Sequence, residues 1–186
     1  MDALKMCEKN EKKHTIEDIM RLPEGIHKEL IDGKIYDMAP PNTRHQRIAF
    51  KISRIIADHI DSKGADCEVF MAPFGIFLSE KDDTYLEPDI AVICDKGKIS
   101  ERGCEGAPDW VVEVVSPSTK SMDYLRKLYK YKQTGVRLYW IVDPITECVS
   151  VYDFTGDIME QYDFNSQIPV AICDDLEIDM SKLLGT

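Results

Sequence analysis

The residue that packing explains least well in this sequence is Glu113, which lies in the middle of an apolar stretch. The stretch reads Asp-Trp-Val-Val-Glu-Val-Val-Ser-Pro-Ser-Thr over residues 109–119. Its β-branched residues and the stop at Pro117 predict a buried strand. Residues alternate between the two faces of a strand, so Glu113 shares a face with Val111 and Val115. An ionised carboxylate buried there without a partner would cost several kcal/mol. We therefore expect a metal ion, a basic side chain or a proton at Glu113, and a purely structural ion pair is one alternative.

Two further carboxylates, Asp89 and Glu29, occupy positions from which they could join Glu113. Asp89 comes directly after a proline at the entrance of a strand predicted over residues 85–94, where proline is tolerated. Glu29 lies on a hairpin predicted over residues 28–38. Carboxylates that face the same way on neighbouring strands form a site for a divalent cation, and Mg²⁺ prefers oxygen ligands together with water. An Asp at a strand entrance also often caps a turn, so the prediction depends on Asp89 and Glu113 as a pair.

Lys127 could supply a positive charge to this group. Together with Asp123 and Tyr131 it recurs at four-residue steps, which places the three on one face of a helix predicted over residues 121–134. The same spacing fits an ordinary Asp–Lys pair on a solvated helix surface. Basic residues that would suit a phosphodiester backbone, or simply face water, gather in this region: Arg126, Lys130, Lys132 and Arg137. These residue types together indicate a metal-dependent hydrolase.

The predicted elements form a mixed α/β pattern around these residues. Thr15-Ile-Glu-Asp18 predicts the start of a short helix, and Asp32-Gly33 predicts a hairpin turn, because such turns need a positive φ. Isoleucines at helical spacing predict a core-facing helix over residues 44–62, with His45 in its first turn. Further strands are expected at residues 67–71, 75–78, 138–143, 148–154 and 158–162, a loop at 95–108, a helix end at Gly135 and a helical turn near 180–184. This order predicts a central sheet with helices packed against it.

Length and composition restrict the class of protein. The chain has 186 residues, 44% of them hydrophobic and 31% charged, so we expect one domain over residues 14–186 after a flexible lead-in at residues 1–13. No stretch has the length of a membrane span, and the N-terminus lacks the apolar core of a signal peptide. The six cysteines show no zinc-like spacing, and we expect buried thiols and a cytoplasmic location. A net charge of -11 argues against a broad nucleic-acid-binding face, although it permits a local basic groove.

Several blocks of the sequence, in the same order along the chain, resemble one known family. The blocks are Glu-Pro-Asp89-Ile-Ala-Val, residues 106–119 around Glu113, Asp123-x-x-x-Lys127-x-x-x-Tyr131 with the Gly-Val that follows, and Tyr-Trp-Ile-Val-Asp-Pro at residues 139–144. With Glu29-Leu-Ile-Asp-Gly and the helix that begins near His45, they are similar to the Uma-type putative restriction endonuclease family, formerly a domain of unknown function. The similarity runs from about His14 to Leu-Glu-Ile-Asp at residues 176–179, nearly the whole chain.

The resemblance implies both a fold and a reaction. The family has the restriction-endonuclease-like fold of the PD-(D/E)XK superfamily, an α/β (α+β) fold with a mixed central β-sheet flanked by helices. It implies metal ligands at Asp89 and Glu113 and a further acidic position of the active site at Glu29. The implied reaction is hydrolysis of DNA phosphodiester bonds with Mg²⁺, for which Mn²⁺ can substitute.

One position departs from the pattern of the superfamily. Its basic residue normally lies two positions after the glutamate, which here is Val115. The resemblance implies that Lys127, on the following helix, takes that place, and His45 matches a common position without an assigned role. Two alternatives stay open: a catalytically inactive nuclease fold that binds DNA or protein, and a structural module in which Lys127 neutralises Glu113. A nuclease that cuts both strands often works as a symmetric dimer, so a homodimer is possible.

Overall fold

The structure of the chain is a computed structural model that describes residues 13–78, 83–116, 121–173 and 175–183, without the side chain of Asp123. The predicted lead-in at residues 1–13 falls outside the described residues except for Lys13. The sequence also predicts a turn at residues 80–83, and of these the structure describes only Asp83. All the site residues predicted from the sequence, Glu29, His45, Asp89, Glu113 and Lys127, are described.

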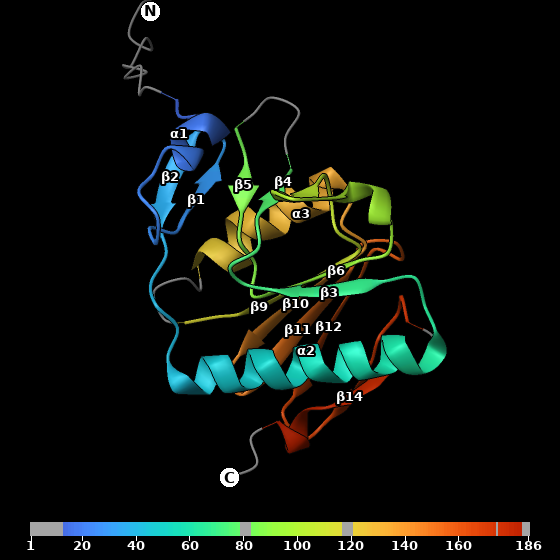
Figure 1. Ribbon diagram of the computed structural model, residues 1–186. Helices are drawn as coiled ribbons and strands as arrows, with labels where there is room; N and C mark the ends of the chain where they lie inside the picture. The colour runs from blue at the N-terminus through green and yellow to red at the C-terminus, as the bar shows by residue number, and fades with distance from the viewer. Residues whose placement is uncertain (1–12, 79–82, 117–120, 174, 184–186) are drawn as a thin grey trace, which may run out of the picture.

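A six-stranded mixed sheet forms the centre of the fold (Figure 1). In spatial order its strands are β12 (Ile158–Asp163), β11 (Cys148–Asp153), β10 (Leu138–Asp143), β9 (Trp110–Val114), β6 (Ile90–Ile93) and β3 (Glu68–Met71). Strand β9 runs parallel to β10 and antiparallel to β6, so the predicted central strand lies in the middle of the sheet. All five of its residues are buried, as its apolar sequence predicts.

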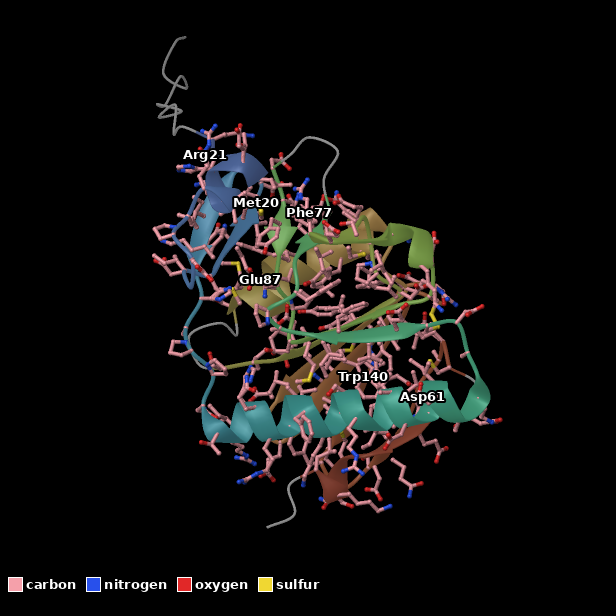
Figure 2. The ribbon with its side chains drawn as sticks, in the orientation of Figure 1. Met20, Arg21, Asp61, Phe77, Glu87 and Trp140 are labelled. Carbon is pink, nitrogen blue, oxygen red and sulfur yellow. A yellow bond between two sulfur atoms is a disulfide. The ribbon has the colours of Figure 1, made fainter. Side chains whose placement is uncertain are left out.

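Helices cover the two faces of this sheet. The 21-residue helix α2 (Thr43–Lys63) crosses one face, and α3 (Leu128–Thr134) lies over the other (Figure 1). Trp140 lies between the sheet and α2 (Figure 2), in a core that includes Trp110 and Val112. Val111 and Val115 belong to the core on the opposite face. The alternation predicted for the β9 strand is therefore confirmed, and Glu113 faces the side of α3.

A second six-stranded sheet packs beside the first and carries the N-terminal part of the chain. Its strands, in order, are β2 (Lys34–Asp37), β1 (Lys28–Ile31), β5 (Tyr85–Leu86), β4 (Ile76–Phe77), β8 (Gly103–Glu105) and β7 (Ile99–Ser100), and α1 (Ile16–Met20) packs against β1. The predicted hairpin is confirmed, with φ values of 52° at Asp32 and 79° at Gly33. A single strand over residues 85–94 is wrong, because the chain leaves this sheet after β5 and enters the central sheet at β6. The break comes at Pro88, which cannot donate a ladder hydrogen bond.

Other predicted elements differ in detail from the observed ones. The predicted loop at residues 95–108 contains the short helix η1 (Lys96–Lys98) and strands β7 and β8. The predicted helix at residues 121–134 consists of a π-helical segment, η2 (Met122–Lys127), followed by α3, and it ends at Gly135 with a φ of 94° as expected. The C-terminal turn is the 3₁₀ helix η3 (Met180–Lys182), and the small hairpin of β13 (Gln167–Pro169) and β14 (Glu177–Asp179) has no counterpart in the prediction. No helix in the described part of the chain is both long and apolar enough to cross a membrane.

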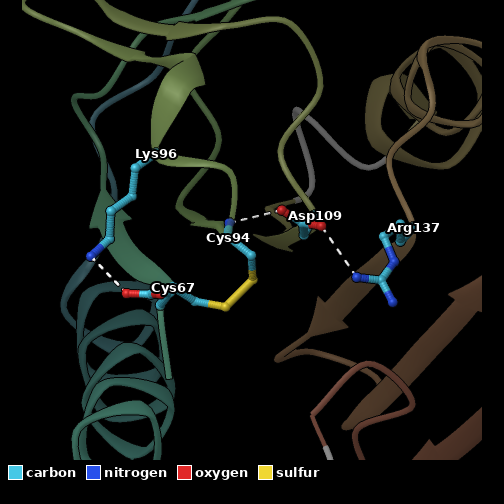
Figure 3. Close-up of a disulfide and its surroundings, with 6 residues drawn as sticks. Cys67, Cys94, Lys96, Asp109 and Arg137 are labelled. Atoms are coloured by element: carbon cyan, nitrogen blue, oxygen red, sulfur yellow. Dashed lines mark hydrogen bonds and ion pairs between the residues drawn. A yellow bond between two sulfur atoms is a disulfide. The ribbon is translucent and has the colours of Figure 1, made fainter. Parts of the chain in front are cut away.

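The expectation that all cysteines are thiols is wrong for Cys67 and Cys94, which form a disulfide (Figure 3). Glu68 pairs with Ile93 in the antiparallel ladder of β3 and β6, so the two cysteines stand opposite each other just beyond the strands. Asp109 accepts a hydrogen bond from the backbone N–H of Cys94 at 2.8 Å and faces Arg137 on its other side (Figure 3). The pairing escaped prediction because 27 residues separate the two cysteines, and only the strand register brings them together.

This disulfide generates a prediction about stability. Replacing both cysteines in a Cys67→Ser/Cys94→Ser variant should lower the free energy of unfolding by about 3 kcal/mol, because the cross-link restricts the unfolded chain. Urea unfolding followed by circular dichroism measures this difference. A reductant should destabilise the wild type to the level of the variant and leave the variant unchanged. Equal unfolding of the wild type with and without reductant would contradict the disulfide.

Candidate active site

The centre of the site is a buried cation between two carboxylates. Nζ of Lys127 lies 2.8 Å from Oε1 of Glu113 and 2.9 Å from Oε1 of Glu29. The three side chains are only 6–7% exposed. They come from η2, β9 and β1. Strand β9 and η2 are close together in the sequence, whereas β1 is far from both. The ammonium of Lys127 thus reaches the carboxylate of Glu113 from the helical segment that follows β9.

The π-helical segment sets the position of Lys127. Lys127 is the last residue of η2, and Tyr131 follows it on α3. The hydroxyl of Tyr131 donates to the same Oε1 atom of Glu113 at 3.3 Å, and its fully buried ring packs against Tyr139. Lys127 and Tyr131 therefore share one helix face, as their spacing predicts. A π-helical turn is wider than an α-helical one and often occurs at functional sites.

Asp89 joins the site from the start of β6. Ile90 pairs with Val112, so continuation of the antiparallel register puts Asp89 opposite Glu113. Its Oδ2 atom accepts a hydrogen bond from the backbone N–H of Val114 at 2.7 Å and lies 3.1 Å from Nε2 of His45. The side chain of Asp89 is thus held between the central sheet and the first turn of α2.

His45 owes its position to the start of its helix. The side chain of Asn42 caps α2 and accepts a hydrogen bond from the backbone N–H of His45 at 2.9 Å. The imidazole is 12% exposed, and its Nδ1 atom is buried without a hydrogen-bond partner among the described residues. The sequence gives His45 no role, and the structure places it against Asp89.

These side chains line one cleft of about 690 Å³. Five carboxylate residues contribute to its described lining (Glu29, Asp37, Glu87, Asp89 and Glu113), and Lys127 is the one Lys or Arg among those lining residues. The cleft therefore carries an excess of negative charge, which favours a bound cation.

The carboxylates of Asp89 and Glu113 are ligands of the type that Mg²⁺ prefers. Asp89 and Glu113 supply carboxylate oxygens to one cleft, and Mg²⁺ is commonly held by one or two carboxylates with water and phosphate completing its shell. Within the described residues, no group of three or more His, Cys, Asp or Glu side chains is arranged as a complete metal cage. Asp89 and Glu113 would thus supply two ligands to such an ion, and water or phosphate would complete its shell.

A histidine–carboxylate pair that the sequence analysis missed lies in the same cleft. Nδ1 of His27 is 3.0 Å from Oε2 of Glu87, and the hydroxyl of Tyr85 donates to Oε1 of Glu87 at 2.7 Å. Glu87 is 7% exposed and directly follows β5 (Figure 2). Burial and the hydrogen bond to Glu87 raise the pKa of the Tyr85 hydroxyl well above its usual range, so it remains a donor. The two-residue spacing of Tyr85, Glu87 and Asp89 draws attention to Glu87, but no signal in the sequence links Glu87 to His27.

The chain is similar to a known family and to several of its relatives. The family model described as Uma2, putative restriction endonuclease, matches residues 16–181. The uncharacterized protein slr1290 of Synechocystis sp. (strain ATCC 27184 / PCC 6803 / Kazusa) is 34% identical over 130 residues, 69% of this chain and 67% of that protein. The uncharacterized protein sll1609 of the same strain is 26% identical over 132 residues, 69% of this chain and 73% of that protein.

A solved structure shares the fold. The crystal structure of a putative nuclease belonging to DUF820, from Anabaena variabilis ATCC 29413, superposes with a TM-score of 0.76 and 23% sequence identity. The match covers 91% of this chain and 96% of that protein, so the mixed α+β fold expected from the sequence is confirmed. By its sequence and its fold, this chain belongs to the Uma2 family of putative restriction endonucleases.

Proposed function

We propose that this protein is a metal-dependent endonuclease that hydrolyses phosphodiester bonds of DNA. The observation that carries the proposal is the contact of Lys127 with Glu113 and Glu29 in the cleft that Asp89 also lines. Hydrolysis of a phosphodiester needs a metal ion held by carboxylates and a positive charge near the reacting phosphate, and these residues could supply both. The family supports a nuclease, and the expected Mg²⁺ dependence and DNA substrate belong to this proposal.

The proposed ligands of the metal ion are Asp89 and Glu113, with Mg²⁺ as the natural ion and Mn²⁺ as a substitute. When bound, the ion would lower the pKa of a coordinated water and offset charge on the phosphoryl oxygens. His45 and the backbone N–H of Val114 hold the carboxylate of Asp89 in a fixed orientation. Such contacts to a ligand normally contribute to metal affinity.

Lys127 has the proposed role of an electrostatic catalyst. Its ammonium is fixed by Glu29 on one side and Glu113 on the other, so it needs no reorganisation when charge develops on the substrate. From this position it would orient the attacking water or stabilise the phosphoryl oxygens. Glu29 acts through Lys127, and the backbone N–H of Glu87 donates to the same Oε1 atom of Glu29 at 3.1 Å.

The basic residues near α3 contribute less to DNA binding than their number suggests. Arg126 contacts Tyr36, Lys130 pairs with Asp32, and Lys132 pairs with Asp157 at 2.6 Å. Against a net charge of -11, approach of a phosphodiester to this cleft would depend on the divalent cation. A homodimer and a cytoplasmic location stay predictions from the sequence.

One observation favours the alternative of a catalytically inactive fold that binds DNA or protein. Lys127 already neutralises part of the charge of Glu113 and Glu29 without any metal ion. In that case the buried pair would serve only to hold β1, β9 and η2 together. The two functions predict different effects of metal ions and of substitutions on cleavage and stability.

The first test is metal-dependent cleavage. With Mg²⁺ or Mn²⁺ the wild type should nick supercoiled DNA, and Asp89→Asn and Glu113→Gln should each reduce the rate about 100-fold or more. Asp61→Asn is the matched control, because Asp61 is an exposed carboxylate at the far end of α2 (Figure 2). Calorimetry should show Mn²⁺ binding that both site variants weaken. No cleavage and no Mn²⁺ binding by the wild type would favour the inactive fold.

The second test uses Lys127→Met. Loss of the ammonium leaves two buried carboxylates without their cation, so the free energy of unfolding should fall by about 3–5 kcal/mol. If the cleft binds a divalent cation, excess Mg²⁺ should recover part of that stability while cleavage stays absent. Thermal unfolding with and without Mg²⁺ measures this effect.

The control for Lys127→Met is Lys132→Met, which removes a lysine from an exposed pair with Asp157. Its stability and cleavage should change little, since exposed ion pairs contribute little. A Lys127→Met protein that loses stability, gains none from Mg²⁺ and still cleaves DNA would contradict the catalytic role.

A further inference from the structure

The pair of His27 and Glu87 has no part in the proposed metal site, yet it lines the same cleft. We propose that His27 is a further catalytic residue, the general acid that protonates the oxygen leaving phosphorus, and that Glu87 and Tyr85 position its imidazole. This inference rests on the proposed nuclease function and adds a residue to it.

The pair combines a buried anchor with an accessible ring. Glu87 is 7% exposed, whereas the side chain of His27 is 48% exposed. Both oxygens of Glu87 are occupied, Oε1 by the Tyr85 hydroxyl and Oε2 by Nδ1 of His27. Since Nδ1 faces Glu87, Nε2 is the nitrogen available to a bound substrate, and the structure records no partner for it among the described residues. A carboxylate that orients one ring nitrogen so that the other can transfer a proton is a common catalytic arrangement.

Contacts link this pair directly to the site centre. His27 directly precedes β1 and Glu29 is the second residue of that strand, so continued alternation puts the two side chains on the same side. The backbone N–H of Glu87 donates to Oε1 of Glu29, the atom that also contacts Lys127. The carboxylate of Glu29 therefore lies between the backbone of Glu87 and the ammonium of Lys127.

Cleavage of the phosphodiester needs a proton donor for the leaving oxygen, and the other residues of the cleft are poorly suited to that role. An alkoxide is a poor leaving group unless it is protonated as the bond to phosphorus breaks. Lys127 is held by two carboxylates, and the other histidine of the described lining, His45, turns Nε2 to Asp89 and buries Nδ1. His27 is thus the imidazole of this lining with an accessible nitrogen.

In the proposed step, the oxygen of a water molecule bonds to phosphorus and releases one proton to solvent. The bond from phosphorus to the leaving oxygen breaks, and its electron pair stays on that oxygen. The protonated imidazole of His27 gives its Nε2 proton to this oxygen and later regains a proton from solvent. The products are an alcohol and a phosphate monoester, and no other reactant is consumed.

The test compares two leaving groups at one cleavage site mapped with the wild type. One oligonucleotide carries the natural leaving oxygen, and the other carries sulfur in its place, which leaves without protonation. Both are cut in Mn²⁺ by the wild type, His27→Gln, Glu87→Gln and the control His59→Gln, which lies on α2. His27→Gln should lose about 100-fold or more on the oxygen substrate and only a few-fold on the sulfur substrate.

Glu87→Gln should show the same pattern with a smaller loss, because it disturbs only the orientation of the ring. His59→Gln should match the wild type on both substrates. An equal loss on both substrates, or no loss on either, would overturn the inference while the wild-type activity upholds the nuclease. A wild type that cuts neither substrate would overturn the nuclease and this inference with it. Thermal unfolding of His27→Gln should match the wild type, since His27 is half exposed.

Discussion

The structure around the cleft depends on the neutralisation of buried charge at Lys127. An ammonium and two carboxylates are withdrawn from water at almost complete burial, and each would be costly alone. Their mutual contacts therefore fix the position of β1 relative to β9 and η2, from which a long stretch of chain separates it. The hydroxyl of Tyr131 and the backbone N–H of Glu87 add donors to the same carboxylates. Hydrogen bonds to charged groups are among the stronger ones in proteins, so this network ties the two sheets together.

The sequence predicts most of what surrounds this network, for identifiable physical reasons. Glu113 stands out because an apolar strand cannot bury a charge alone, and the spacing of Lys127 and Tyr131 puts both on one helix face. The turn at Asp32-Gly33 needs a positive φ, which glycine tolerates, so the first hairpin could be predicted. These predictions use local periodicity or turn geometry, and the structure confirms each of them.

What the sequence could not provide depends on contacts between distant residues. Alternation along residues 85–94 cannot show that the chain changes sheets at Pro88, which leaves Glu87 and Asp89 beside different partners. The disulfide follows from the register of β3 and β6, and the π-helical form of η2 has no periodic signal of its own. His27 is an isolated histidine before a short strand, and only the fold brings it to Glu87.

The arrangement of the two histidines argues against a purely structural reading of the cleft. A structural ion pair requires only Lys127 and a carboxylate, and it would be expected in a closed core that excludes water. Here the buried network opens onto a cleft of about 690 Å³, which Asp89 with His45 and Glu87 with His27 also line. Asp89 and Glu87 are carboxylates held in fixed orientation, Asp89 by the largely buried imidazole of His45 and Glu87 beside the exposed imidazole of His27. Ionisable groups gathered in this way reduce the stability of the folded chain, and such clusters are typical of functional sites, so the clustering itself favours chemistry at this site.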